Sequence, residues 1–275
     1  MYRSFEPSEP LSPYVECYWS WRIDPAAPVL ESILPDVAPE LIVHMASAPS
    51  AQDEVGDWRQ QDQAFLYCAA HKSLVLRITR PMSLFAVRFR PWGAGRFSNT
   101  SMAAMLDRPI PPAEALGDMG ARLVASLVKA ESDASRVKLA NQALEAALQL
   151  PIRSEARMKM LLDATNGGRC SSAEMAGKLS MSDRSFSRLW NEIVGIQPRK
   201  YIQLMRLHNA LEKIDAGVPL AQVAAECGYS DQAHMARQIK AITGLAPSVL
   251  RRRLGDGVYQ DLYASRPAAP WQVPH

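Results

Sequence analysis

Near the C-terminal end, two stretches of the chain place apolar residues at the spacing of an amphipathic helix. The first has them at Phe186, Leu189, Trp190 and Ile193, and the second at Met235, Ile239 and Ile242. Positions i, i+3, i+4 and i+7 lie on one side of a helix, so each stretch predicts a helix with one buried face. A glycine follows each pattern, Gly195 in the first and Gly244 in the second, as expected for a helix end.

The two stretches belong to a motif that occurs twice. Residues 171–198 read SSAEMAGKLSMSDRSFSRLWNEIVGIQP, and residues 219–247 read PLAQVAAECGYSDQAHMARQIKAITGLAP. The residues that recur 48 positions later are Ala173, Ala176, Ser182 and Asp183, and those that recur 49 positions later are Arg188, Gly195 and Pro198. The change of offset indicates one residue inserted beyond Asp231. A repeat of this length determines the architecture of the region.

Each copy has the local signals of a helix-turn-helix unit. In the first copy, Ser171 and Glu174 have the spacing of a capping box, which predicts the start of a short helix. Ala173 and Ala176 are small enough to let another helix approach closely. Ser182 is placed to accept hydrogen bonds from the free N–H groups at the start of the next helix.

The segment between the copies, residues 198–216, predicts a linker helix. Pro198 suits its first turn, and Gly217 with Pro219 ends it. Its apolar face is formed by Ile202, Met205, Leu211 and Ile214. A helix of about 18 residues spans roughly 27 Å. That length is comparable with the roughly 34 Å between successive major grooves on one side of a duplex.

The outward faces of the two second helices carry side chains that can read DNA. They are Arg184, Ser187 and Arg188 in the first copy and Gln232, His234 and Arg237 in the second. Arg and Gln pair with base edges in the major groove, which the second helix of a helix-turn-helix unit enters. Candidates for phosphate contacts, at or near helix starts, are Ser171, Ser172, Arg199 and Lys200. For the last two, a solvated helix start is the alternative.

Charge supports this interpretation. Residues 153–253 contain 16 Lys and Arg against 9 Asp and Glu, whereas the rest of the chain contains 15 against 19. The basic segment coincides with the repeated motif. Such asymmetry indicates that this segment binds a polyanion.

These motifs resemble a known family. GYSDQAHMARQIKAITGLAPSVLR resembles the second helix-turn-helix of AraC/XylS-type transcription regulators, and SMSDRSFSRLWNEIVGIQPRKYIQLMRL resembles their first unit and linker helix. The resemblance implies a bipartite domain over residues 153–254 that binds double-stranded DNA. It also implies a bacterial cytoplasmic regulator with RNA polymerase as a partner, and it leaves open whether the protein activates or represses. This sequence departs from the family pattern at Ala233, which cannot hydrogen-bond a base, and at Met235, where an aromatic residue is usual. We therefore expect the second unit to read less sequence than the first.

Before about residue 99 the pattern changes to short strands. YVECYWSW alternates, which places Val15, Cys17, Trp19 and Trp21 on one predicted face. LIVHM, SLVLRIT and SLFAVRFR are further strand segments, bounded by Pro, Gly or Ser clusters. Residues 1–110 are therefore predicted to form a small antiparallel barrel or sandwich.

After the Pro-rich break PIPP, residues 111–150 predict two helices. Their apolar positions include Leu123, Leu127 and Val128 in the first helix and Val137, Leu144 and Leu148 in the second. They are expected to cover the β domain, to form a homodimer face, or both. A further helix is expected over residues 153–166, and residues 255–275 form a Pro-rich tail. The fold class is thus a two-domain α+β protein with an all-α C-terminal domain.

The β-rich segment also shows a resemblance. FAVRFRPWGAGRF, with PELIVHM upstream, is similar to the N-terminal domain of a subset of AraC-type regulators, which implies a sensor module for a small-molecule effector. Trp19 and Trp21 are candidates to line its pocket, and Arg88 and Arg90 to hold an anionic effector. The alternatives are core packing for the tryptophans and solvation for the arginines. A catalytic N-terminal domain, or one that binds another protein, is also open.

Other functional classes lack their signals. The five histidines include no H-x-H pair, and there is no G-x-S-x-G or Gly-rich phosphate loop, so we expect neither a metal, a cofactor nor an enzyme. His44 is interpreted as a barrel residue. The scattered cysteines, Cys17, Cys68, Cys170 and Cys227, are expected to be free thiols. No apolar run is long enough to cross a membrane, and the N-terminus is not a signal peptide.

Overall fold

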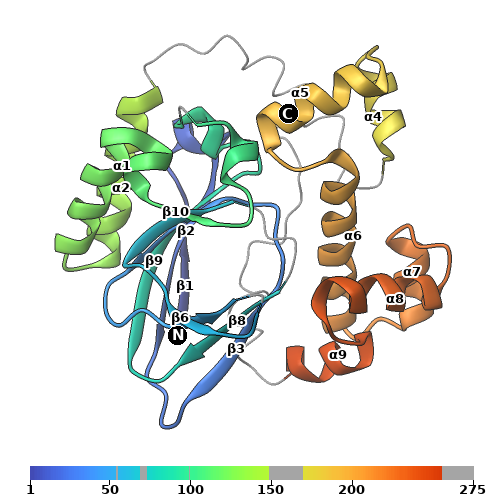
Figure 1. The fold of residues 1–275 in the computed structure, drawn as a ribbon, viewed down its shortest axis with the longest axis horizontal. Helices are drawn as coiled ribbons and strands as arrows, with labels where there is room; N and C mark the ends of the chain where they lie inside the picture. The colour runs from blue at the N-terminus through green and yellow to red at the C-terminus, as the bar shows by residue number, and fades with distance from the viewer. Residues whose placement is uncertain (54, 69–72, 99, 149–169, 256–275) are drawn as a thin grey trace. The chain divides into compact units, whose positions relative to one another are not determined.

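The computed structural model describes residues 1–53, 55–68, 73–98, 100–148 and 170–255, with side chains to residue 252 (Figure 1). The chain divides into two compact units, one formed mainly by residues 1–153 and the other mainly by residues 154–275. The first contains the strands and two helices, and the second is helical, so the predicted α+β class is confirmed. The helix expected over residues 153–166 and the tail expected after residue 255 lie outside the described residues.

Two antiparallel sheets form the N-terminal unit. The larger has the order β1 (Tyr2–Phe5), β2 (Val15–Ile23), β9 (Met82–Phe89), β4 (Glu40–His44), β7 (Ala64–Tyr67) and β10 (Pro109–Ile110). The smaller has the order β3 (Val29–Ile33), β8 (Leu74–Ile78), β5 (Ser50–Gln52) and β6 (Trp58–Gln60). The four predicted strand segments correspond to β2, β4, β8 and β9. The other strands are two to five residues long, which is too short for a clear alternating pattern.

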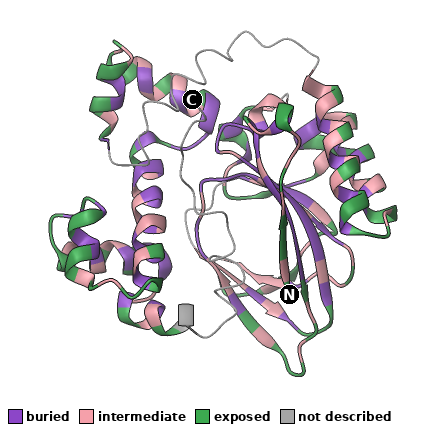
Figure 2. Ribbon diagram, turned by 180° about the vertical axis from the view of Figure 1, so that it is seen from behind, coloured by how far each residue is buried: buried purple, intermediate pink, exposed green. Residues whose placement is uncertain are grey.

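Strands β2 and β9 are paired inside the larger sheet, and most of their residues are buried on both faces (Figure 2). On β9, Phe85 and Val87 face the same side of the sheet as Tyr18. The alternate residues Leu84 and Ala86 face the other side, with Trp19 and Trp21. The predicted face of β2 is wrong at its first member. The register shifts between Val15 and Cys17, so this β-bulge turns Val15 to the side of Tyr18.

Helices α1 (Pro112–Lys129) and α2 (Asp133–Leu148) pack against the larger sheet (Figure 1). Leu123, Leu127 and Leu144 are buried in one core with Phe85 and Val87 of β9. The two helices therefore cover one face of the larger sheet, whereas a dimer face stays a prediction. The assignment of Val128 to the buried face is wrong, because its side chain is 40% exposed.

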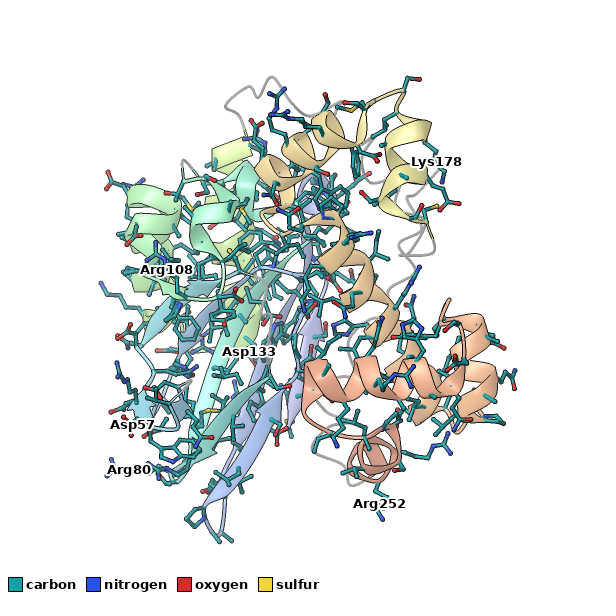
Figure 3. All side chains as sticks on the ribbon, turned by 45° about the vertical axis from the view of Figure 1, so that its right-hand side comes forward. Asp57, Arg80, Arg108, Asp133, Lys178 and Arg252 are labelled. Atoms are coloured by element: carbon teal, nitrogen blue, oxygen red, sulfur yellow. The ribbon has the colours of Figure 1, made fainter. Side chains whose placement is uncertain are left out.

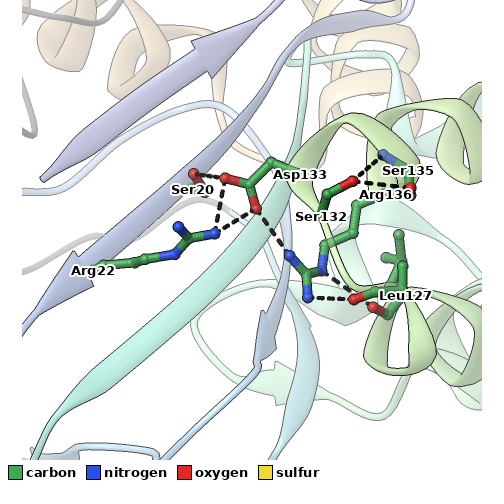
Figure 4. Close-up of polar contacts among 8 residues, drawn as sticks. Ser20, Arg22, Leu127, Ser132, Asp133, Ser135 and Arg136 are labelled. Atoms are coloured by element: carbon green, nitrogen blue, oxygen red, sulfur yellow. Dashed lines mark hydrogen bonds and ion pairs between the residues drawn. The ribbon is translucent and has the colours of Figure 1, made fainter.

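A polar cluster joins the two helices to β2. Asp133, labelled in Figure 3, accepts hydrogen bonds from Ser20 and Arg22 of β2 at 2.9–3.0 Å (Figure 4). Arg136 also binds Asp133, at 2.9 Å, and donates to the carbonyls of Leu127 and Ala130 at the end of α1. One buried carboxylate thus connects the end of α1, the start of α2 and the sheet. Each of these charges has partners, as burial requires.

The C-terminal unit contains the two predicted helix-turn-helix copies and their linker. The first copy is α4 (Ser172–Lys178) with α5 (Asp183–Val194), and the second is α7 (Leu220–Glu226) with α8 (Gln232–Thr243). Helix α6 (Pro198–Asp215) connects them, and α9 (Pro247–Gly255) packs against α6 and α8. The capping box of Ser171 and Glu174 is confirmed. Ala176 is buried as expected, but Ala173 is exposed.

The turns of the two copies share one hydrogen bond but differ in length. Met181 N donates to Ala176 O at 2.9 Å, and Tyr229 N donates to Ala224 O at 3.0 Å, so both first helices end in the same way. The residue just before each of these donors has a left-handed backbone conformation: Ser180 with φ 53° in the first copy and Gly228 with φ 75° in the second. The N-cap of α8 is Asp231, whereas that of α5 is Ser182. The extra residue of the second copy therefore lies in the turn, before the cap, and not beyond Asp231 as predicted.

An aromatic cluster attaches α5 to α6. The Trp190 ring lies 5.7 Å from that of Phe186 and 4.9 Å from that of Tyr201 on α6, in an edge-to-face arrangement with Tyr201. All three side chains are at most 1% exposed. The Trp190 Nε1 is buried and has no hydrogen-bond partner among the described residues. The indole therefore contributes through packing, not through a hydrogen bond.

We predict that Trp190→Ala lowers the free energy of unfolding by about 3–5 kcal/mol, because it leaves a cavity between α5 and α6. Trp190→Phe is the matched control and should lose much less, since the cluster keeps an aromatic ring and no hydrogen bond is broken. Urea unfolding followed by the helical circular dichroism signal measures both. Equal losses for the two variants would contradict the packing role.

Candidate nucleic-acid interface

Helix α5 presents the first set of predicted base-reading residues. Ser182 caps its start by accepting from Ser185 N at 3.3 Å. Phe186 and Trp190 are buried on one face, which orients the opposite face outward. Arg184 and Arg188 are exposed on that outward face, and Ser187 is half-buried beside them. Solvent-exposed arginines at the start and middle of a helix are suited to enter a major groove.

Helix α8 presents the second set on the same plan. The Asp231 carboxylate accepts from His234 N at 2.6 Å, and this backbone hydrogen bond lowers the pKa of Asp231 below its usual value. Met235 and Ile239 are fully buried, while Gln232 and Arg237 are exposed. Counted from the caps, Arg237 occupies the position that Arg188 has in α5.

His234 differs from the other predicted base-reading residues because its ring is already hydrogen-bonded. Its Nδ1 lies 2.9 Å from Ser230 Oγ, and its Nε2 lies 2.7 Å from Gln238 Nε2. The edge of the ring contacts Tyr229, with the ring centroids 5.8 Å apart. A direct base contact by His234 requires one of these hydrogen bonds to be exchanged.

The four predicted phosphate contacts lie around one pocket. Ser171, Ser172, Arg199 and Lys200 line a pocket of about 490 Å³ in the C-terminal unit. Ser171 also caps α4, and its N–H donates to the Glu174 carboxylate at 2.6 Å, which lowers the pKa of Glu174. These residues come from the starts of two separate helices, α4 and α6, so their spacing in the sequence does not indicate a shared pocket.

Four further polar residues line this pocket and were not predicted from the sequence: Gln197, Gln203, Arg206 and Gln238. A signal for Arg206 was present, because Arg199, Gln203 and Arg206 have i, i+4, i+7 spacing on α6 and so share one face of it. Gln238 carried no such signal. It lies on the second copy, far from the others in sequence.

In the N-terminal unit, Arg88 was predicted either to hold an anionic effector or to be solvated, but its side chain is buried among acidic residues. Its guanidinium binds three carboxylates, Glu16 at 3.1 Å, Asp36 at 2.6 Å and Glu40 at 2.7 Å. Burial lowers the pKa of Arg88, but the charges of Asp36, Glu16 and Glu40 outweigh burial and raise it well above its usual value. Arg88 is therefore neither solvated nor open to an anionic effector, and we exclude it from the proposed ligand site.

Arg90 and its neighbours anchor a loop. Arg90 Nε donates to Ser12 O at 2.7 Å, and Trp92 Nε1 donates to Pro13 O at 2.8 Å. A Cβ on Gly93 would lie 1.8 Å from Tyr14 O, so only glycine permits this close approach. The phrase FAVRFRPWGAGRF thus joins the end of β9 to the segment before β2.

Trp19 and Trp21 lie on the face of the larger sheet opposite the helices. They are 7% and 3% exposed, and Trp19 stacks on Tyr2 with the ring centroids 5.6 Å apart. Burial on this face is compatible with core packing and with the wall of a ligand pocket, so their predicted role stays a prediction.

His44 lies on the same face as Trp19 and Trp21 and is 1% exposed. Its Nε2 lies 3.3 Å from Gln61 Oε1, and its Nδ1 is buried without a hydrogen-bond partner among the described residues. Burial lowers the pKa of His44, and the hydrogen bond to Gln61 opposes that effect. Within the described ranges, no cluster of His, Cys, Asp and Glu side chains is arranged to hold a metal ion.

The four cysteines are buried free thiols, as expected. Burial raises the pKa of Cys17 and of Cys68 to about 12. These thiols are therefore protonated near neutral pH and are weak nucleophiles.

Comparison with protein families divides the chain in the same way as its fold. Residues 175–253 match the model of a helix-turn-helix domain, and residues 3–111 match a domain of unknown function, DUF6597. The C-terminal unit is an AraC-type helix-turn-helix domain. With this domain the chain is a DNA-binding transcription regulator, which confirms the recognition made from the repeated motif.

Several solved structures are similar to this chain. ToxT from Vibrio cholerae, in a 1.65 Å structure, is 11% identical with a TM-score of 0.47, over 86% of this chain and 97% of that one. ToxT from strain SCE256 with an unsaturated fatty acid bound is 9% identical with a TM-score of 0.43, over 84% and 97%. An AraC-type regulator from Chromobacterium violaceum is 20% identical with a TM-score of 0.34, over 38% and 96%. Among curated proteins no match is found.

Membrane insertion by a helix receives no support from the structure. None of the helices in the described parts of the chain combines the length and the apolar character needed to span a bilayer.

We predict that burial of His44 makes the stability of the N-terminal unit depend on pH. A histidine whose folded pKa is lowered contributes stability that is fully present above its unfolded pKa, about 6.5, and is lost as the pH falls from that value toward the lower folded pKa. The unfolding free energy should therefore decline as the pH falls below about 6.5. His44→Gln should flatten this decline when tryptophan fluorescence follows urea unfolding. Parallel pH profiles for the two proteins would contradict the prediction.

Proposed function

We propose that this AraC-type regulator reads DNA with α5 and α8 in successive major grooves on one side of the duplex. Arg184, Ser187 and Arg188 contact bases in one groove, and Gln232, His234 and Arg237 contact bases in the next. Helix α6, with 18 residues, has a length of roughly 27 Å, which is comparable with the groove separation of roughly 34 Å. The double contact gives a longer recognition sequence than one helix could read.

One observation carries this proposal. Arg188 and Arg237 are exposed at the same position of two equally long helices, each held by a buried face and a capped start. Arginine is the side chain that most often makes specific contacts in the major groove, through a bidentate pair with guanine. Two such side chains at equivalent sites support recognition of two related half-sites.

For the N-terminal unit we propose an effector that changes DNA affinity by favouring one conformation of the protein. The buried aromatic face with Trp19 and Trp21 supports a small, mainly apolar ligand, as does the His44 ring, whose Nδ1 has no hydrogen-bond partner among the described residues. Arg88 takes no part, because its charge is already neutralised by three carboxylates.

Protein partners follow from the same proposal. A bacterial regulator acts in the cytoplasm through RNA polymerase, and a second copy of the chain is the partner that would double the number of half-sites. The resemblance to AraC/XylS-type regulators is what supports these partners.

The proposal is tested by selecting bound sites from a pool of random duplexes. We expect two blocks of base preference spaced by about one helical turn, roughly 10 base pairs. Selection of a single block, or of no preference at all, would contradict the use of both recognition helices.

On the selected duplex, we predict that Arg188→Ala weakens binding by about 1–3 kcal/mol and relaxes the preference at one base pair. Arg188→Lys is the matched control, because it keeps the charge but loses the bidentate geometry. Compared with Arg188→Ala, Arg188→Lys should regain affinity for random duplexes but should regain little of the preference for the selected base pair. Equal losses on selected and random duplexes for Arg188→Ala would contradict a base contact.

We also predict that at least one small apolar compound shifts the affinity of the full chain for the selected duplex. Fluorescence anisotropy across a compound panel measures this shift, and Trp19→Ala should remove the response while leaving the affinity without compound unchanged. A panel that stabilises the protein thermally without altering DNA affinity would contradict the regulatory role of the N-terminal unit.

A further inference from the structure

The pocket in the C-terminal unit is built by parts of both helix-turn-helix copies. Ser171 and Ser172 come from the start of α4, Arg199, Lys200 and Arg206 from α6, and Gln238 from α8. The remaining lining consists of two glutamines and one isoleucine of the segment that begins α6. The pocket, of about 490 Å³, therefore lies where the first copy, the linker helix and the second copy meet.

The chemistry of this lining suits an anion. Three of the lining side chains are cations and none is a carboxylate. The others offer hydroxyl and amide groups, which can donate hydrogen bonds to oxygen atoms. Elsewhere in the protein, buried arginines such as Arg88 and Arg136 are matched by carboxylates. No Asp or Glu side chain is among the residues that line this pocket.

Arg206 occupies a distinctive position in this pocket. Its side chain is half-buried, and its Nε is buried without a hydrogen-bond partner among the described residues. It extends beside the turn of the second copy, where a Cβ on Gly228 would lie 3.5 Å from that Nε. Burial raises the pKa of Tyr229 to about 12, and the nearby charge of Arg206 opposes that rise. Packing against the turn thus limits the conformations that Arg206 can adopt.

We infer that this pocket binds one phosphate of the DNA backbone, in the stretch between the two major-groove contacts, with Arg206 as its central ligand. Arg199 and Lys200 flank the phosphate, and Gln238 donates from the side of α8. The inference rests on the proposed function, because it needs α5 and α8 on the same duplex. It adds a backbone contact that is centred on the linker helix α6.

A phosphate ligand at this point has a specific consequence. Arginine matches phosphate oxygens with two parallel N–H groups, so the contact constrains position as well as charge. A phosphate carries no base identity, but it fixes the register of the protein on the duplex. The pocket therefore sets the spacing between the two half-sites, while the recognition helices set their sequence.

The test replaces single backbone phosphates of the selected duplex by neutral methylphosphonates, one position at a time between the two half-sites. For the wild-type full chain, one position should lower affinity by about tenfold, as expected for loss of a charged hydrogen-bonded contact. Arg206→Gln should bind the unmodified duplex correspondingly more weakly and should not respond to the modification at that position. Its dependence of log K on log salt should be shallower by about one unit.

Two control variants separate the explanations. Arg80, exposed in the turn before β9 (Figure 3), lies in the N-terminal unit, and Arg80→Gln should leave affinity and salt dependence unchanged. Arg206→Lys should show the salt dependence of the wild-type chain, because it keeps the charge. Its affinity should lie between those of the wild-type chain and Arg206→Gln, because lysine lacks the paired donors of arginine. If Arg206→Gln fails to fold, the methylphosphonate series on the wild-type chain still decides the question.

The outcomes distinguish the two proposals. If the wild-type chain selects no preferred duplex, the proposed function fails. If it selects two half-sites but no intervening phosphate matters, or if Arg206→Gln keeps the wild-type salt dependence, only the phosphate pocket is overturned. Sensitivity to one intervening phosphate that disappears in Arg206→Gln supports it.

Discussion

The packing of Trp190 between Phe186 and Tyr201 is the contact on which DNA reading by the first unit depends. It joins the recognition helix α5 to the linker helix α6 through three buried aromatic rings. A recognition helix must be held to its scaffold, because a change in its angle displaces Arg184 and Arg188 from the base edges they would contact. The second unit is held to the same linker by α9, where Arg251 donates to Val218 O at 2.6 Å, just beyond the end of α6. Helix α6 is thus the common support for both recognition helices.

The two units of the chain differ in whether their key charged side chains are buried or exposed. In the N-terminal unit, Arg88 and Asp133 are buried and their charges are matched by partners within 3.1 Å. Removing one partner from such a cluster leaves an uncompensated buried charge, so these residues are committed to the fold. In the C-terminal unit, Arg184, Arg188 and Arg237 are exposed. The same residue type therefore has a structural role in one unit and a binding role in the other, and burial decides between them.

The sequence predicted the features that depend on local spacing. The apolar period of α5, α6 and α8, the cap at Ser171 and the alternation of β9 all follow from residues close together in the chain. What could not be predicted depends on distant residues. The carboxylates around Arg88 come from two other segments, Glu16 from one and Asp36 with Glu40 from the other. The bulge that turns Val15 appears only in the pairing with β9, and Gln238 and Arg206 line one pocket only through the tertiary fold.

The two copies of the motif share a fold but not the same capacity to read bases. Aligned by their caps, Ala233 stands where the first copy has Arg184, so a donor is missing from the first turn of α8. His234 is at the next position, but its ring is bound to Ser230 and Gln238. Gln232 and Arg237 remain as the exposed polar residues able to pair with bases without rearrangement. The longer turn before Asp231 also shifts the start of α8 relative to α7. The second half-site should therefore be shorter and more tolerant than the first, and the duplicated architecture reads an asymmetric sequence.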